Sequence, residues 1–208
     1  MIPLRQGGRV ALIDYGAGNL TSVRKGFAAA GAELYTPGAP RDLNRASGVV
    51  VPGVGHFSAT AALGKEWRLG IHRSLDRGVK LLGICLGQQW LFEGSEEDPQ
   101  VPGLGVIKGW CRRLPPTLKV PHVGWNSLDI QKPSRLLAGI EPGTQAYFTH
   151  SYAADITPEA VAITTHAAPF ASVVETELLF GVQFHPEKSG NAGLRMLKNF
   201  VRLCSPSA

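Results

Sequence analysis

The sequence predicts an α/β fold with a mostly parallel central sheet, helices on both of its faces and a β-rich C-terminal half. Three observations lead to this prediction. Short, continuously apolar runs alternate with helical stretches in the first half of the chain, which is typical of parallel strands buried on both faces. One such run ends in a cysteine flanked by glycines, which indicates a sharp strand-to-helix turn, a nucleophile elbow. Beyond residue 115, short β-type runs separated by turn residues replace the alternation.

The length and composition indicate a single domain. The chain has 208 residues, of which 44% are hydrophobic, and this is enough for one domain with a full core. We find no internal repeat and no low-complexity linker that would divide it. We therefore expect one domain over residues 1–208, with a core that covers about residues 9–204.

The elements follow in chain order from the apolar periodicity. In the first half, the predicted strands are residues 10–14, 33–35, 48–51 and 80–84. The helices between them are residues 20–30, closed by Gly31, residues 67–77, ended by Gly78, and a run from the cysteine turn to near Glu93. In the second half, the predicted strands are residues 120–123, 146–148, 161–165, 172–175 and 178–184. A final amphipathic helix covers residues 192–203, with Leu194, Leu197 and Val201 on one face.

The strand over residues 80–84 runs directly into Cys85, with small residues, Gly83 and Gly87, two positions to either side. A nucleophile on such a turn is lifted clear of the sheet edge, and the backbone N–H of Leu86 can then stabilise an oxyanion. A free cysteine is also often a buried structural residue, so Cys85 taken alone does not establish catalysis.

A second polar group follows an apolar run in the C-terminal half. The run ends at His185, and Glu187 follows at i+2, a spacing that places both side chains on one face of an extended chain. A thiol nucleophile needs a histidine to accept its proton and a carboxylate to orient the imidazole. The alternative for this pair is an ordinary strand-end histidine beside a solvated carboxylate.

Two separated motifs together resemble the signature of the class I glutamine amidotransferases: Gly83-x-Cys85-x-Gly87-x-Gln89 and His185-Pro186-Glu187. In that family a cysteine, a histidine and a glutamate hydrolyse the side-chain amide of glutamine, so the resemblance implies that Cys85, His185 and Glu187 are catalytic. Residues 49–55, a buried strand that runs into a glycine-rich turn, resemble the oxyanion strand of the family. The oxyanion hole implied by the resemblance combines Leu86 with Gly53, Val54 and Gly55.

Three further stretches narrow the resemblance to one branch of the family, the glutaminase subunits of the imidazole glycerol phosphate synthases. These stretches are residues 14–20, 121–126 and 147–152, and the similarity extends from about residue 10 to about residue 201. The branch implies that ammonia from glutamine passes to a separate (β/α)₈-barrel cyclase subunit in histidine biosynthesis, with no metal or cofactor in this subunit. The turn at residues 16–18 lacks the third glycine of a dinucleotide-binding motif, so no nucleotide is expected there.

Several other residues are assigned by the same resemblance. The candidates for binding glutamine are Gln89, Glu97, His150 and Ser151. Gln89 also lies four residues after Cys85, on the same face of a helix, although a polar surface position is the alternative. The candidates for the partner interface are Asn19, His122, Trp125, Tyr147 and Lys188. Trp and Tyr are common interface anchors, but they are equally often core residues.

The composition excludes several other classes of function. The net charge is +5, but the basic residues are scattered and only 18% of residues are charged, so we expect no nucleic-acid binding. The apolar run near the start ends at Asp14, which argues against a secretion signal or a membrane span. The three cysteines, Cys85, Cys111 and Cys204, have no C-x-x-C spacing and leave one over in any disulfide scheme. This favours reduced thiols in the cytoplasm and gives no zinc site; Cys204 is expected in a tail after the last helix.

Three alternatives remain open from the sequence. The chain could serve another synthase, such as anthranilate or aminodeoxychorismate synthase, although residues 14–20 argue against this. It could be a catalytically silent regulatory subunit, which an intact Cys85, His185 and Glu187 disfavours. It could also be a redox-sensing or protease-like cysteine protein, because a fold does not determine a function.

Overall fold

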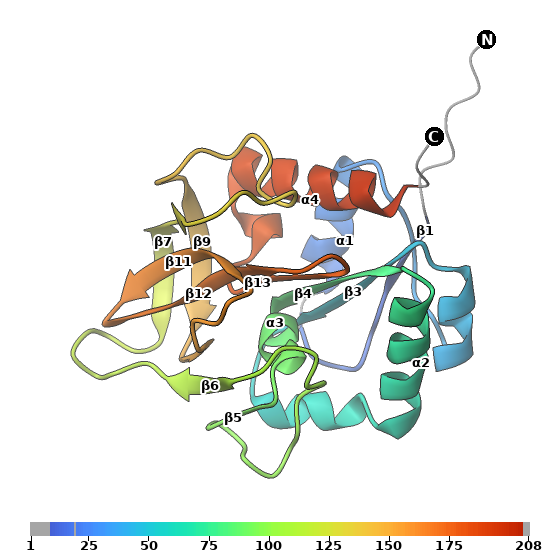
Figure 1. Ribbon diagram of the computed structural model, residues 1–208, viewed down its shortest axis with the longest axis horizontal. Helices are drawn as coiled ribbons and strands as arrows, with labels where there is room; N and C mark the ends of the chain where they lie inside the picture. Colours follow the sequence, from blue (N-terminus) through green and yellow to red (C-terminus); the bar gives the residue numbers. More distant parts are fainter. Residues whose placement is uncertain (1–8, 19, 206–208) are drawn as a thin grey trace.

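An eight-stranded sheet forms the centre of the computed structural model, which describes residues 9–18 and 20–205 (Figure 1). In order across the sheet, the strands are β2 (Glu33–Tyr35), β1 (Arg9–Leu12), β3 (Gly48–Gly53), β4 (Lys80–Cys85), β13 (Leu179–Val182), β12 (Ala168–Glu175), β11 (Ala160–His166) and β8 (Asp129–Ile130). Neighbours from β2 to β13 pair in parallel, and neighbours from β13 to β8 pair antiparallel. The predicted α/β fold is confirmed, and the β-rich half extends the same sheet.

Helices cover both faces of this sheet. In Figure 1, α1 (Leu20–Ala29) and α4 (Gly190–Cys204) lie above it, and α2 (Lys65–Asp76) and α3 (Leu86–Leu91) lie below. On the first face, Phe27 and Phe200 pack edge to face in one core cluster that also contains Val50. On the other face, Trp90 and Val51 belong to a second cluster. Because Val50 and Val51 are consecutive and both buried, β3 has no polar face, which explains its continuous apolar sequence.

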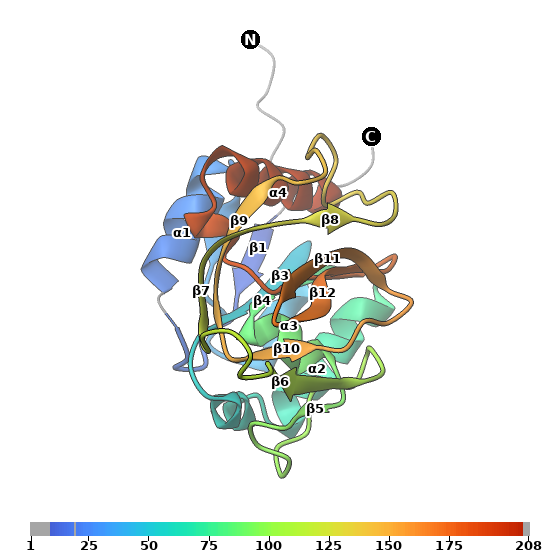
Figure 2. The ribbon, with the colours of Figure 1, turned by 90° about the vertical axis from the view of Figure 1, so that its left-hand side faces the viewer.

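Two small sheets flank the central one. The first contains β10 (Tyr152–Ala154), β6 (Trp110–Arg113) and β5 (Gly94–Ser95), and the second pairs β7 (His122–Ser127) with β9 (Gln145–His150). Figure 2 turns the β7–β9 pair towards the viewer. The sequence predicted β7 and β9 with shifted bounds, but it missed β5, β6, β8 and β10, which are two to four residues long and lie outside the apolar runs that marked the other short strands. Three 3₁₀ segments complete the described part of the chain: η1 (Pro40–Arg45), η2 (Phe57–Ala62) and η3 (Pro186–Lys188).

The predicted helix and strand bounds differ from the structure by a few residues at several ends. The helix after Cys85 ends at Leu91, before Glu93, and α4 continues to Cys204. The prediction that Cys204 lies in a tail is therefore wrong. It is a buried residue of α4 that packs on β3, where a Cβ added to Gly48 would lie 2.3 Å from its Sγ. Burial raises the pKa of the Cys204 thiol to about 12.

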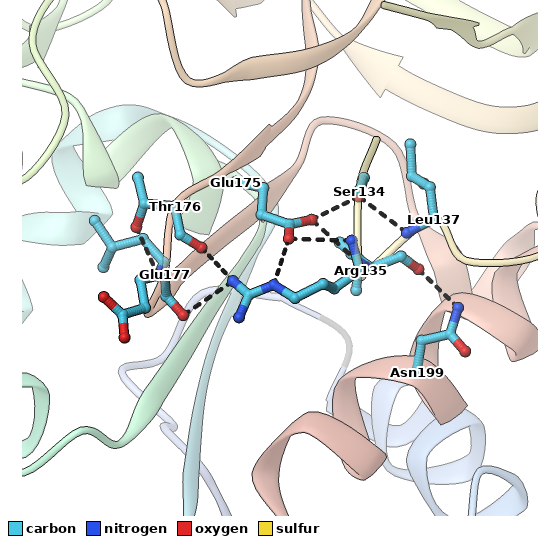
Figure 3. Close-up of polar contacts among 9 residues, drawn as sticks. Ser134, Arg135, Leu137, Glu175, Thr176, Glu177 and Asn199 are labelled. Carbon is cyan, nitrogen blue, oxygen red and sulfur yellow. Dashed lines mark hydrogen bonds and ion pairs between the residues drawn. The ribbon is translucent and has the colours of Figure 1, made fainter. Parts of the chain in front are cut away.

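The connection from β8 to β9 is tied to the sheet by a nearly buried carboxylate and to α4 by an asparagine (Figure 3). Glu175, at the end of β12, accepts hydrogen bonds from Ser134 Oγ at 2.5 Å and from Arg135 Nε at 2.8 Å. Asn199 of α4 donates to the carbonyl oxygen of Leu136 at 2.9 Å. These contacts hold the loop that leads into β9, one of the strands at the candidate site.

In the part of the chain that the structure describes, no helix has both the length and the apolar character needed to cross a lipid bilayer.

Candidate functional site

Cys85 occupies a strained turn between β4 and α3. Its φ of 53° lies in the left-handed region, which is uncommon for a residue with a side chain, and α3 begins at the next residue, Leu86. A Cβ on Gly83 would lie 2.5 Å from the carbonyl oxygen of Gly87, and a Cβ on Gly87 would lie 1.7 Å from the carbonyl oxygen of Val51. Both positions therefore require glycine, and the predicted strand-to-helix turn at Cys85 is confirmed.

His185 and Glu187 are paired, but the local geometry differs from the prediction. Strand β13 ends at Val182, and His185 precedes the 3₁₀ turn η3, which begins with Pro186. The two side chains therefore meet across a turn, and not along an extended strand as the i+2 spacing suggested. His185 Nδ1 lies 2.8 Å from Glu187 Oε1, and both side chains are 3% exposed. The alternative of a solvated Glu187 is therefore wrong.

The sheet order brings the separated motifs to one edge. Strands β4 and β13 are parallel neighbours, with Ile84 opposite Val182, so both chains leave the sheet at the same end. Strand β3 is the other neighbour of β4 and places Gly53 opposite Cys85. The carboxyl ends of parallel strands are the usual location of ligand sites in such sheets.

The charges around His185 favour its protonated form. Burial alone would lower the pKa of His185, because it removes the imidazolium from water. The nearby Cys85 sulfur and the Glu187 carboxylate, whose Oε1 lies 2.8 Å from His185 Nδ1, act in the opposite direction and raise this pKa from 6.5 to about 10. An imidazolium flanked by a carboxylate and a cysteine sulfur is the arrangement that activates a thiol nucleophile.

A cavity of about 200 Å³ opens beside Cys85. Its lining comes from the cysteine turn, the oxyanion strand, the β9–β10 region and the segments that precede β6 and β7: Gly55, Cys85, Leu86, Gln89, Glu97, Pro121, Thr149, His150, Ser151 and Tyr152. All four residues that the resemblance assigned to glutamine binding thus line one cavity together with Cys85.

Gln89 and Glu97 are held by specific hydrogen bonds at this cavity. Gln89 is 4% exposed, so the alternative of a polar surface position is wrong. Its Nε2 donates to the carbonyl oxygen of Tyr152 at 2.8 Å and to Gln183 Oε1 at 3.2 Å. Glu97 Oε2 accepts a hydrogen bond from the backbone N–H of Phe57 at 2.8 Å, which fixes its carboxylate.

His150 and His122 form a second, neutral histidine pair. His150 Nδ1 lies 2.9 Å from the carbonyl oxygen of Tyr152, and His150 Nε2 lies 3.0 Å from His122 Nδ1. A carbonyl can only accept, so each ring donates through Nδ1 and His150 accepts through Nε2. Burial lowers the pKa of His150 to about 3 and that of His122 to about 4, and His166 nearby lowers both further. The sequence analysis gave His122 as a candidate for the partner interface. In the structure, His122 is 4% exposed and lies beneath the outer surface of β7.

An aromatic patch, in which Trp125 is exposed and Tyr147 is half-buried, lies next to the η3 turn. The Trp125 side chain on β7 is 56% exposed, and its ring meets that of Tyr147 edge to face at 6.0 Å between centroids. Lys188 Nζ lies 5.8 Å from the centre of the Tyr147 ring. A second cavity, of about 50 Å³, is lined by His185, Glu187, Lys188 and the oxyanion strand. Asn19, the remaining interface candidate, lies outside the described residues.

The sequence analysis missed Gln183 and gave Cys111 no role. Gln183 is fully buried, and its Nε2 lies 3.6 Å from Cys85 Sγ. The one signal was a polar residue inside an apolar run two positions before His185. Cys111 lies in β6, and its Sγ is 3.6 Å from the carbonyl oxygen of Gln89, behind α3. Burial raises the pKa of the Cys111 thiol well above its usual value, so it is a packing residue.

Comparisons with known proteins agree on one family. The model described as glutamine amidotransferase class-I matches residues 11–204. The chain is 46% identical over 198 residues to imidazole glycerol phosphate synthase subunit HisH from Moorella thermoacetica, covering 93% of this chain and 94% of the relative. The HisH subunit from Deinococcus radiodurans is 43% identical, covering 99% and 98%.

Solved structures show the same fold at lower identity. A chain of the PurLQS structure from Thermotoga maritima superposes with a TM-score of 0.75 at 18% identity, covering 94% of this chain and 98% of that chain. A glutamine amidotransferase crystal structure superposes with a TM-score of 0.72 at 16% identity, covering 94% and 99%. At these identities the similarity concerns the fold alone.

Proposed function

We propose a mechanism and a partner surface for this chain, which belongs to the class I glutamine amidotransferase family and, within it, to the HisH glutaminase subunits of imidazole glycerol phosphate synthase. As a member of that family, it hydrolyses glutamine to glutamate and ammonia in histidine biosynthesis. The residues that act, the route of the ammonia and the docking surface are our proposals.

In the first half of the reaction, the thiolate of Cys85 attacks the side-chain amide carbon of glutamine. A C–S bond forms, and the amide oxygen takes the negative charge. The backbone N–H of Leu86 and one N–H from Gly53, Val54 or Gly55 hold this oxyanion, and each such donor contributes about 10²–10³ in rate. The imidazolium of His185 then protonates the amide nitrogen, the C–N bond breaks, and ammonia leaves a thioester on Cys85.

In the second half, water hydrolyses the thioester. His185 is now neutral and takes a proton from the water as its oxygen attacks the thioester carbon. The C–S bond breaks, glutamate leaves, and the imidazolium–thiolate pair is restored. Glu187 keeps the His185 ring oriented throughout, through the 2.8 Å contact at Nδ1. General acid–base catalysis of this kind contributes about 10²–10⁴ in rate.

One observation carries this mechanism: Cys85 sits on a strained elbow beside a histidine whose pKa is raised to about 10, at the mouth of a small cavity. A structural cysteine needs neither the elbow nor the charged histidine. The combination supports nucleophilic catalysis over a silent regulatory role.

Glutamine binds, in this proposal, in the cavity next to Cys85. The Glu97 carboxylate suits the α-ammonium group of the substrate, and Ser151 suits its carboxylate. Gln89 uses its Nε2 on Tyr152 and Gln183, so it meets the substrate with its Oε1. His150 lines the same cavity as a neutral ring.

The cyclase subunit, a (β/α)₈ barrel, docks on the patch that contains Trp125, Tyr147 and Lys188, and the resemblance adds Asn19 to the partner contacts. An exposed Trp ring beside a half-buried Tyr and a cation is typical of interface anchors. His122 supports this patch from beneath. Ammonia leaves His185 through the smaller cavity, whose lining includes Lys188. A cytoplasmic location belongs to the same proposal, because all three cysteines are free.

Docking also activates the site. Gly55 has a φ of 108°, and a Cβ there would meet nothing within 4 Å, so this peptide has room to turn its N–H towards the oxyanion. A cyclase loaded with its nucleotide substrate favours the turned state and thereby accelerates hydrolysis.

The experiment is glutamate release from glutamine by the purified chain, alone and with a barrel cyclase plus its nucleotide substrate. We expect strong activation only in the complex, and no release by Cys85→Ala with an unchanged thermal melting curve. Activity that ignores the cyclase would point to another synthase, such as anthranilate synthase. No release by the folded wild type under either condition would support the regulatory alternative.

A further inference from the structure

Gln183 lies directly behind the nucleophile, and the mechanism above does not use it. The side chain is fully buried, and its Nε2 lies 3.6 Å from Cys85 Sγ, within the range of an N–H···S hydrogen bond. The backbone N–H of Gln183 donates to the carbonyl oxygen of Ser172 at 2.9 Å, so its position is set by the central sheet. A buried amide in contact with a reacting atom calls for an explanation.

The orientation of the Gln183 amide follows from its neighbours. The carbonyl oxygen of Tyr152 can only accept, so the group of Gln89 that faces it at 2.8 Å is the NH₂ group. The same Nε2 faces Gln183 at 3.2 Å, so Gln183 must present its oxygen there. The NH₂ group of Gln183 therefore points at Cys85 Sγ, and a flipped amide would place two donors against each other.

The Tyr152 carbonyl is itself held in place from the other side. It accepts a second hydrogen bond, from His150 Nδ1 at 2.9 Å, and His150 in turn accepts one from His122 at 3.0 Å. Asn126 Nδ2 lies 3.3 Å from His122 Nε2. This chain of neutral groups starts on β7 and fixes the two glutamine amides behind the nucleophile.

We propose that Gln183 is a further catalytic residue, whose side-chain N–H donates to Cys85 Sγ and stabilises the thiolate. A hydrogen bond to a charged acceptor is about twice as strong as one to a neutral acceptor, so the bond favours the thiolate over the thiol. An amide does not titrate near neutral pH and cannot compete with His185 for the proton. Stabilisation of the thiolate also assists its departure from the thioester. This inference rests on the proposed hydrolysis of glutamine at Cys85.

The test is Gln183→Met, which keeps the length of the side chain and removes both hydrogen-bonding groups. We measure the rate of Cys85 alkylation by iodoacetamide against pH, with peptide mapping to separate Cys85 from Cys111 and Cys204. Loss of one bond to a charged acceptor should move the midpoint of the profile up by about one pH unit. In the complex with the cyclase, kcat should fall about tenfold, with a smaller change in KM.

A matched control is Gln88→Met. Gln88 is also fully buried, but its Nε2 donates to the carbonyl oxygen of Ala171 at 2.9 Å. This variant should lose stability and leave the alkylation profile in place. An unshifted profile in Gln183→Met, or an equal shift in both variants, would overturn the inference.

If Gln183→Met does not fold, Gln183→Glu provides the same test. Glutamate keeps the shape and the acceptor for Gln89, but it places a carboxylate where the donor stood, so the midpoint should rise further. A wild-type profile in this variant would overturn the inference. Failure of the wild type to release glutamate defeats the proposed function, whereas an unshifted profile with an active wild type defeats this inference alone.

Discussion

At the η3 turn, His185 is buried against Glu187 and Cys85, and its pKa is raised to about 10. In the β7–β9 pair, His150 and His122 are buried to a similar degree, and their pKa values fall to about 3 and about 4. Burial disfavours the charged form in both regions. The difference comes from the partners, since anionic groups face His185, whereas a backbone carbonyl and other histidines face the neutral pair.

The two charge states suit two tasks. A protonated His185 can give its proton to departing ammonia and can stabilise a thiolate beside it. The neutral pair keeps one donor and one acceptor on each ring, which fixes the direction of the hydrogen bonds from Asn126 to the Tyr152 carbonyl. Similar burial of the same residue type therefore gives a reactive group at one place and a structural connector at the other.

Replacing one histidine from each region should separate the two tasks. His185→Gln removes the proton donor, so kcat for glutamate release with the cyclase should fall by about 10²–10⁴. His122→Gln acts on the nucleophile only through several intervening groups, so it should cost at most about tenfold, roughly 1.4 kcal/mol of activation free energy. Equal losses in two folded variants, compared by circular dichroism, would show that the distinction between the regions is wrong.

The neutral pair should limit stability at low pH. The folded-state pKa of His150 is about 3, below the value of 6.5 for an unperturbed histidine, so the unfolded chain binds more protons. The contribution of neutral His150 to the unfolding free energy is fully present above pH 6.5 and declines as the pH falls from there towards 3. Between pH 7 and pH 4, the wild type should lose on the order of 2–4 kcal/mol of unfolding free energy more than His150→Gln.

Urea denaturation at each pH measures this difference, because contributions from groups common to both proteins cancel. A comparison of the wild type with His185→Gln should show the opposite pH dependence of the unfolding free energy. The raised pKa of His185 stabilises the fold fully below pH 6.5, and this contribution is lost as the pH rises through 10. Parallel curves for the wild type and His150→Gln from pH 7 to pH 4 would contradict a neutral, buried His150.

Replacing Glu175, whose carboxylate lies outside both regions, should have the smallest effect on activity. The Glu175 side chain is 9% exposed and accepts hydrogen bonds from Ser134 and Arg135, but no histidine or cysteine is among its partners (Figure 3). Glu175→Gln should lower the unfolding free energy by about 1–3 kcal/mol. Glutamate release should not change measurably, and a large loss of activity without a loss of stability would show that the β8–β9 connection reaches the site.

Much of the candidate site could be predicted from local sequence. The elbow at Cys85 follows from glycines that pack too closely for a Cβ, and the pairing of His185 with Glu187 follows from a short motif. Gln183 could not be found in this way. It lies in the same motif as His185, but its contact with Cys85 depends on the pairing of β13 with β4 and on the orientation of Gln89.

The sequence by itself determined the α/β class, the main strands in chain order and the sharp turn that carries Cys85, because these depend on periodicity and on residues that are close in the chain. Only the tertiary structure decided which histidine is charged, that His122 lies beneath the surface of β7, and that Gln183 faces the sulfur. The physical reason is that protonation and hydrogen-bond direction depend on burial and on partners from distant strands. Local sequence patterns do not contain that information.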